Sequence, residues 1–507
     1  MFSSVSTAIL LPLGPLVVYG FYLGLQRLFF HPLLKFPGPK LAALTYMYMA
    51  YYDIEGTMVD HLEQLHETYG PVVRIGPEQL HFNDPRAYED IYAIGSKFTK
   101  EARFYDCFNE PESSFGFIDI KKAKQRKDVM RPLFSRRAIL KLENVIQTTT
   151  DQLVSALLSH SSPASKPKPK PVNLHLGYLS TTMEIILAYC FARSYDAVLA
   201  PDFRHPILIA LKSVGSLFFV LQHFPFLLPL FTNMPAWFAR LVAPKSLAYG
   251  EIIADLSAQI NQLVKNPGML ENAEHEIIYH QLLTPGKDGG EIPSKRSLLH
   301  EATVMIGAGS ETVGNTCNIG SFYVLSNPTI QKKLVDELCG IWPDVDATVN
   351  FEKLEKLPYL TAIIKESLRM SHGVVSPLPR VVPTPTIIAG MQIPANTVVA
   401  MGATFMHYDS RVFEDPFVFR PERWVDQDVQ KAREMENFLV PFSKGPRSCL
   451  GINLAWAELY LMFANVFRKV EMEVYETTAE DFKFNAYLMP QYRGRQFRVI
   501  VKQKRTM

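Results

Sequence analysis

A long proline-free segment constrains the fold of this chain more than any other part of the sequence. Residues 297–326 lie between Pro293 and Pro328 and contain no proline, so they can form one continuous helix of about eight turns. The segment is largely uncharged after Glu301, and a helix without a polar face is buried on most sides. We therefore expect a central helix with other helices packed around it.

The rest of the chain alternates helical patterns with proline-rich turns, and it contains 36 prolines and no internal repeat. Further helices are predicted over residues 351–370 and 452–470. Short strands are predicted near residues 72–75 and over 377–399, where prolines and β-branched residues alternate. The sequence therefore predicts a mainly α fold with small β-sheets, in one domain over residues 41–507.

Composition excludes several classes of function. The formal net charge is only +2, so no nucleic-acid partner is indicated. The five cysteines are odd in number and never form a Cys-x-x-Cys pair, which argues against a disulfide framework or a zinc site and fits a reducing compartment. They are Cys107, Cys190, Cys317, Cys339 and Cys449.

The N-terminus has the features of a membrane anchor. Residues 8–25 are apolar apart from tyrosine, glycine and proline, and as a helix they would span about 27 Å, close to the hydrocarbon core of a bilayer. Arg27, the first charge, is followed by two lysines, which places the remaining chain in the cytosol. We expect a single-pass transmembrane anchor over residues 1–30 and a proline-rich hinge over 31–40. A signal peptide or a buried helix is the alternative.

A ten-residue stretch near the C-terminus carries the strongest chemical signal. It runs from Phe442 to Gly451 as Phe-Ser-Lys-Gly-Pro-Arg-Ser-Cys-Leu-Gly, with Arg447 two residues before Cys449. The cysteine precedes a predicted helix, whose free N–H groups can hydrogen-bond a sulfur atom. A lone cysteine is usually a buried structural thiol, and this is the alternative. In such a loop, however, a thiolate can bind a haem iron and donate electron density to it.

This stretch resembles the cysteine-ligand loop of the cytochrome P450 family, F-x-x-G-x-R-x-C-x-G. The resemblance implies a haem-thiolate monooxygenase fold that binds haem b, with Cys449 as the metal ligand. It implies that Phe442 and Gly451 also bind the cofactor and that Arg447 pairs with a haem propionate. Similarity extends from the anchor to Arg493 and is greatest to fungal microsomal members, which implies the endoplasmic reticulum membrane.

The middle of the long helix reads Ala308-Gly-Ser-Glu311-Thr312. It resembles the family's A-G-x-[DE]-T segment, which crosses the oxygen-binding side of the haem. The resemblance implies that Thr312 hydrogen-bonds bound oxygen and that Glu311 relays protons from solvent. The glycine would leave room for dioxygen, and the threonine hydroxyl can bond a local carbonyl and open the helix. By itself, such a small-residue pentapeptide more often marks a helix contact.

Glu366 and Arg369 lie three residues apart and therefore on one helix face. Such a pair is usually a surface salt bridge worth less than about 1 kcal/mol. Arg423, in the sequence Pro-Glu-Arg, resembles the third member of the family's E-x-x-R and P-E-R network. The resemblance implies a buried network with a structural role in folding and haem retention.

Three further basic residues are candidates for binding the haem propionates. Arg380 resembles the family's strand arginine, with a surface arginine as the alternative. In the helix where the family usually has Trp or His followed four residues later by Arg, this chain has Ala123 and Lys127. Lys127 or Arg126 could replace the missing arginine. A solvated basic face that receives an acidic electron donor is the alternative.

Apolar positions that face substrate in relatives indicate an apolar small-molecule ligand. They are Phe115, Ala308, Val374, Val375, Leu378 and Leu488. The resemblance implies a monooxygenase that uses dioxygen and electrons from NADPH, delivered by a separate flavoprotein reductase. Its substrate would be a terpenoid or another fungal secondary metabolite. A haem-thiolate isomerase or dehydratase is the alternative, and a non-enzymatic haem-binding protein is a third.

Overall fold

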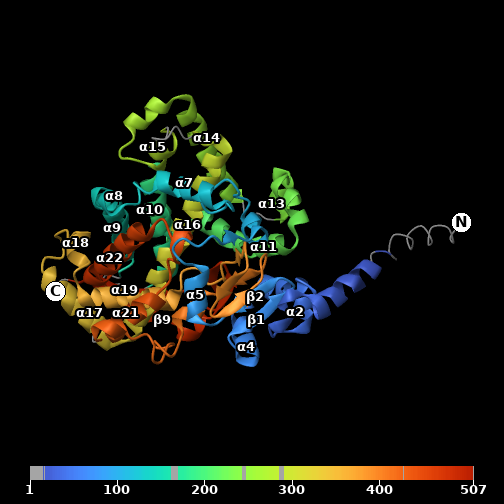
Figure 1. The fold of residues 1–507 in the computed structure, drawn as a ribbon. Helices are drawn as coiled ribbons and strands as arrows, with labels where there is room; N and C mark the ends of the chain where they lie inside the picture. Colours follow the sequence, from blue (N-terminus) through green and yellow to red (C-terminus); the bar gives the residue numbers. More distant parts are fainter. Residues whose placement is uncertain are drawn as a thin grey trace.

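The computed structural model describes residues 15, 17–161, 170–242, 247–284, 291–425 and 427–505. Helices dominate, and small sheets lie among them (Figure 1). The prediction of a mainly α fold with small β-sheets is confirmed. The longer helices are α9 (Glu143–Ser159), α10 (Leu174–Phe191), α11 (Pro206–His223), α14 (Leu247–Lys265), α16 (Lys295–Ser326), α17 (Pro328–Ile341), α19 (Pro358–Ser371) and α22 (Ile452–Lys469). The shorter α-helices are α2 (Lys40–Leu44), α3 (Met47–Glu55), α4 (Met58–Tyr69), α5 (Pro85–Ile91), α6 (Ala102–Tyr105), α7 (Ile120–Met130), α8 (Arg136–Lys141), α12 (Leu228–Thr232), α13 (Ala236–Val242), α15 (Ile278–Leu282), α18 (Phe351–Leu354), α20 (Ala403–His407) and α21 (Val429–Phe438).

The predicted central helix is α16. The Ser294 hydroxyl caps its first turn by accepting from the Ser297 N–H. The helix ends at Asn327, whose side chain caps α17 directly before Pro328. Its most extensive packing is against α10, and the two helices approach closely at Gly309, where a Cβ would lie 2.6 Å from Ile186 Cγ1. A side chain at this position would force the helices apart, at a cost of about 1–3 kcal/mol.

The described part of the chain contains four small sheets. The largest has five strands in the order β1 (Val72–Gly76), β2 (Gln79–Phe82), β8 (Val398–Ala400), β5 (Arg380–Val381) and β3 (Thr99–Lys100). Its only parallel pair is β2 with β8. A three-stranded sheet has the order β4 (Val172–Asn173), β12 (Arg498–Lys504) and β9 (Val470–Tyr475). The two hairpins are β6 (Thr386–Ile388) with β7 (Met391–Ile393), and β10 (Phe484–Tyr487) with β11 (Met489–Tyr492).

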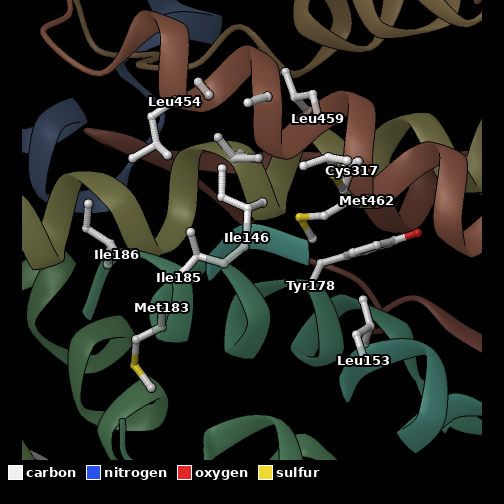
Figure 2. Packing of buried hydrophobic residues seen from close by; sticks show 14 of the residues in the cluster. Ile146, Leu153, Tyr178, Met183, Ile185, Ile186, Cys317, Leu454, Leu459 and Met462 are labelled. Carbon is white, nitrogen blue, oxygen red and sulfur yellow. The ribbon is translucent and has the colours of Figure 1, made fainter. Parts of the chain in front are cut away.

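The main hydrophobic core lies between the long helices. Figure 2 shows Ile146 of α9, Cys317 of α16 and Met462 of α22 pointing into the space between these helices. All three side chains are fully buried. A second core lies under the five-stranded sheet, around Leu62 and Phe82. These two cores hold α16 and the five-stranded sheet at fixed positions. Candidate functional residues lie on α16 and on this sheet.

The N-terminal helix extends away from the body (Figure 1). An apolar helix occupies Val17–Phe30, and most of its large side chains are exposed; residues 1–14 and 16 of the expected anchor lie outside the described residues. The expected hinge at 31–40 packs against the body, because Leu33 is buried and Pro37 O accepts from the Arg74 N–H at 2.7 Å. The segment Pro201–His223 also has the length and hydropathy of a membrane span. It packs against α3 and α14, however, as a helix of the body.

Candidate active site

A cavity of about 310 Å³ lies between the middle of α16 and the loop at residues 442–451. The walls are predominantly apolar, and Thr312 and Cys449 both line them. These two residues were expected on opposite sides of a haem, and the fold brings them to one space. The cavity is therefore the candidate active site.

The backbone of the cysteine loop is shaped by two glycines. Gly445 has φ of +69°, and a Cβ there would lie 2.5 Å from the carbonyl oxygens of Tyr92 and Ala93, so only glycine fits. The Cys449 N–H donates to Phe442 O at 2.9 Å, which closes the loop. Gly451 lines the cavity, and a Cβ there would have no protein atom within 4 Å among the described residues. A flat group lying over the loop would use this space.

The Cys449 side chain lies deep in the protein but remains accessible because it faces the cavity. Burial raises the pKa of its thiol, while the Gly451 N–H and the Lys127 ammonium favour the thiolate. Gly451 directly precedes α22, so its N–H is one of the free donors at a helix N-terminus. Binding of a metal cation would displace the thiol proton and give a thiolate ligand.

Four cations gather at one side of the cavity. Lys100 and Arg380 are direct partners on the neighbouring strands β3 and β5, and both side chains are buried. Lys127 and Arg447 line the cavity nearby, and Lys127 Nζ donates to Ser448 O at 2.7 Å. Burial and the charges of Arg380, Arg447 and Lys127 hold the pKa of Lys100 well below its usual range. Burial and Arg380 also lower the pKa of Arg447 to about 10.

This cluster lacks a counter-charge. None of the four cations forms an ion pair with a carboxylate within 4 Å in the part of the chain that the structure describes. Like charges placed opposite each other in a sheet are destabilising, and buried charges are normally paired. The two propionates of a haem would supply the missing anions. The cluster, the accessible thiol and the space over Gly451 together fit a haem.

Two of the expected propionate ligands differ in detail from the expectation. Arg126 turns away from the cavity and pairs with Glu301 at 3.1 Å, which joins α7 to the start of α16. Arg380 lies behind the cavity wall, where its Nη1 donates to Tyr105 Oη at 2.7 Å. Lys100 was missed, because its position opposite Arg380 depends on pairing between distant strands and has no local sequence signal.

The distal residues of α16 face different spaces. Thr312 lines the cavity, and its hydroxyl donates to Ala308 O at 3.0 Å, the local carbonyl bond expected of a threonine here. Glu311 instead lines a second pocket on another face of the helix, together with Lys212 of α11. Burial raises the pKa of Glu311, and the Lys212 charge lowers it. An acid and an alcohol thus lie on two sides of one helix.

The expected substrate positions divide into two groups. Phe115, Ala308, Val374 and Leu378 line the cavity. Val375 instead packs with Val59 and Ala486, and Leu488 packs in an aromatic cluster with Phe219 and Tyr487. Leu488 accepts from the Val375 N–H at 2.9 Å, so both residues support the wall from behind.

Glu366 lies at the centre of a buried network. Its carboxylate accepts from Arg369 Nε at 2.9 Å and Nη2 at 2.7 Å, and from Arg423 Nε at 3.1 Å. Trp424 Nε1 and the backbone N–H of Arg420 also donate to it, each at 2.9 Å. Glu366 and Arg369 are fully buried, so this is no surface salt bridge.

A thiol and an alcohol across one apolar cavity, with unpaired cations beside it, define a haem-thiolate oxidoreductase. The chain belongs to the cytochrome P450 family, to which residues 37–495 match. It is 33% identical to a cytochrome P450 monooxygenase of Penicillium terrestre, over 98% of this chain and 97% of that protein. It is 34% identical to the tryptophan 6-hydroxylase of Fusarium equiseti, over 92% of each chain. It is also 34% identical to the N-acetyltryptophan 6-hydroxylase of Emericella nidulans, over 95% of this chain and 94% of that protein.

These relatives are fungal monooxygenases and hydroxylases, and the present protein is a haem-dependent monooxygenase. The predicted family and reaction class are therefore confirmed. Neither the isomerase or dehydratase alternative nor the non-enzymatic haem carrier is favoured by the relatives. Like other P450 monooxygenases, the protein acts with a redox partner, dioxygen and a small-molecule substrate.

Proposed function

We propose that this protein is a haem b monooxygenase of the endoplasmic reticulum membrane that oxidises an apolar terpenoid or another secondary metabolite. Electrons come from NADPH through a separate flavoprotein reductase. One observation carries the proposal: Thr312 and Cys449 share one apolar cavity, with Lys100, Lys127 and Arg447 beside it. This arrangement suits a haem lying between the thiolate and the alcohol.

Each residue has a separate task in this proposal. Cys449 holds the iron, while Lys100, Lys127 and Arg447 bind the propionates, with Arg380 behind them. The haem, once bound, supplies the activation of dioxygen. Thr312 presents a hydroxyl inside the cavity that can hold or pass a proton. Because the other walls are mostly apolar, they exclude bulk water and favour an apolar substrate.

Exposed apolar side chains support a membrane location. The helix Val17–Phe30 exposes Val17, Val18 and Phe21 to between 68% and 69% of their surface. A second apolar surface over α12 and α13 includes Leu230, Trp237 and Leu241. Such surface is costly in water and suits the lipid boundary. The single-pass anchor with a cytosolic catalytic domain follows from the positive charges after the helix.

Exposed basic residues on α7 support the choice of an acidic electron donor. Lys121, Lys122 and Lys124 are exposed on this helix, and Arg131 is exposed directly after it. Lys127 reaches the cavity beside the cysteine loop. A flavoprotein with an acidic surface would be attracted to this face, near the cysteine side of the haem site.

The test is reconstitution with a fungal NADPH-dependent reductase and a substrate panel. The panel contains terpenoids, polyketides and tryptophan derivatives, the last because two relatives are named as tryptophan hydroxylases. We expect NADPH- and dioxygen-dependent product that contains one oxygen atom from ¹⁸O₂. Turnover without NADPH or dioxygen would refute the monooxygenase assignment for that substrate. Product from tryptophan derivatives alone would refute the terpenoid choice.

A further inference from the structure

Helix α16 has two functional faces. Ala308, Thr312 and Thr316 line the haem cavity. Glu311, Asn315 and Asn318 share the next face, at the i, i+4 and i+7 spacing of a helix, and line the second pocket. This second pocket has a volume of about 180 Å³ and lies between α10, α11, α16, β11 and residues 494–497. We call it the polar pocket for its buried polar side chains, although apolar atoms form most of its lining.

The walls of the polar pocket carry buried polar atoms that need partners. His175, Asn315 and Asn318 are 5%, 4% and 0% exposed. Nδ2 of Asn315 has no protein partner among the described residues. Nδ1 of His175 and the Asn318 amide make no hydrogen bond of normal geometry there, although the amide acts on His175 and raises its pKa. Buried polar atoms are almost always hydrogen-bonded, and a space of this size and polarity suits several waters. The exposed residues 494–496 at its rim connect the pocket to solvent.

Two cationic residues line this pocket: Arg495 lies at its exposed rim, and Lys212 lies deeper inside. Lys212 of α11 donates from Nζ to His175 Nε2 of α10 at 2.6 Å. Burial, and then the Lys212 charge, hold the pKa of His175 well below its usual range, so His175 is a neutral acceptor. Lys212 is also the charged group that acts on Glu311, although no carboxylate in the described chain lies within 4 Å of it. A bridging water is the natural link between this ammonium and the Glu311 carboxyl.

We propose that Lys212 and His175 form the proton entry of the monooxygenase reaction, which carries solvent protons to Glu311. A proton leaves Lys212 Nζ and reaches the Glu311 carboxylate through the bridging water, which gives a neutral amine and a carboxylic acid. The amine then takes one proton from hydronium supplied through the pocket, while His175 Nε2 holds the Nζ in place. Each cycle moves one proton from solvent to Glu311, and no electrons move.

Both residues act through Glu311 and are therefore positioning residues. The inference rests on the proposed roles of Glu311 and Thr312 in passing protons to the cavity. The alternative is a purely structural role, in which the hydrogen bond between Lys212 and His175 only holds α11 against α10. A purely structural hydrogen bond would affect the stability of the fold. A proton entry would instead affect the rate at which the Glu311 carboxyl exchanges its proton and the amount of product formed per NADPH.

The first experiment follows proton exchange at Glu311 in the full-length holoenzyme. Its carboxyl infrared band, assigned by comparison with Glu311→Gln, is followed after transfer into D₂O. Lys212→Met keeps most of the stem but removes the ammonium, and exchange should slow by about tenfold or more, since a positioned proton carrier commonly gives 10²–10⁴-fold and water bypasses part of the path. Lys212→Arg keeps the cation, but a guanidinium does not give up its proton, so exchange should slow as it does in Lys212→Met.

The second experiment measures coupling in the reconstituted enzyme. Lys212→Met should form less product and more hydrogen peroxide per NADPH, with an unchanged carbon monoxide spectrum. Lys469→Met is the matched control, because Lys469 is a partly buried lysine that ties α22 to Asp151 of α9 at 2.9 Å, away from Glu311. If Lys212→Met does not fold, His175→Gln tests the same path and should slow exchange in the same direction.

The outcomes separate this inference from the proposed function. In one outcome, Glu311→Gln and Thr312→Ala uncouple the enzyme, but Lys212→Met and His175→Gln show the same exchange and coupling as Lys469→Met. The proton entry is then wrong, and the proposed function stands. If Glu311→Gln and Thr312→Ala both keep full coupling, the proton path fails, and the Lys212 entry fails with it. Slow exchange together with uncoupling in both Lys212→Met and Lys212→Arg, but not in Lys469→Met, supports the entry. A Lys212→Arg variant that matches wild type would show that only the charge is needed and would refute proton transfer from Lys212.

Discussion

Replacing Arg369 with alanine should destabilise the fold strongly, because Arg369 makes more contacts than its pairing with Glu366. It donates twice to the Glu366 carboxylate and also to His407 O at 3.0 Å and Pro416 O at 2.6 Å. Removing one partner of a buried pair typically costs about 3–5 kcal/mol. Glu366 would keep Arg423 and Trp424 as donors, so we expect the lower half of this range.

Arg420 provides a matched control within the same network. Its backbone N–H donates to Glu366, which the Arg420→Ala variant preserves, while its exposed side chain only pairs with Glu414 at 3.0 Å. This control should lose less than about 1 kcal/mol. The assay is urea unfolding together with haem content per polypeptide. A loss of about 3 kcal/mol is a large part of the stability of a typical domain, so haem retention should fall sharply. Equal stability and haem content in Arg369→Ala and Arg420→Ala would refute the reasoning.

Four further results are expected. Cys449→Ser should lose the red-shifted Soret band of the reduced carbon monoxide complex, and a variant that keeps it would exclude Cys449 as the ligand. Thr312→Ala should keep that band but form about tenfold less product per NADPH and more peroxide; unchanged coupling would assign proton transfer to another group. Lys100→Met should weaken haem binding by about ten- to a hundred-fold, because one charge-assisted hydrogen bond of about 1.5–3 kcal/mol is lost. The apoprotein should become no less stable. Unchanged haem affinity would exclude Lys100 from the propionate site. Deleting residues 1–26 should release protein from membranes with haem intact, and release of the intact protein by a carbonate wash would argue against an integral anchor.

The sequence predicted those parts of the fold that depend on local pattern. Prolines at 293 and 328 and the scarcity of charge between them set the bounds of α16 to within a few residues. The bridge from Lys100 to Arg380 could not be predicted this way, because it depends on which distant strands pair. The packing of residues 31–40 against β1 is likewise a tertiary effect, which a proline-rich composition does not reveal.

The cavity wall at residues 374–378 was predicted only in part by comparing single positions with relatives. Val374, Ser376 and Leu378 line the cavity, whereas Val375 points to the opposite side. Val374 and Val375 therefore do not both face substrate, and no regular strand sets this alternation, because residues 374 and 376 lie in bends. The neighbouring residue that lines the cavity is Ser376, whose hydroxyl accepts from the Leu488 N–H at 3.1 Å.

The acid and the alcohol of α16 face different spaces. Consecutive side chains on an α-helix point about 100° apart, and the cavity takes Thr312 and Val313, whereas Glu311 on the other side of Thr312 lines the polar pocket. The helix therefore stands between a polar pocket that reaches solvent and an apolar cavity that excludes bulk water. In the proposed relay, protons pass around α16 here, where the Thr312 hydroxyl donates to Ala308 O. An apolar substrate can thus be kept dry while protons are supplied from the other side of the helix.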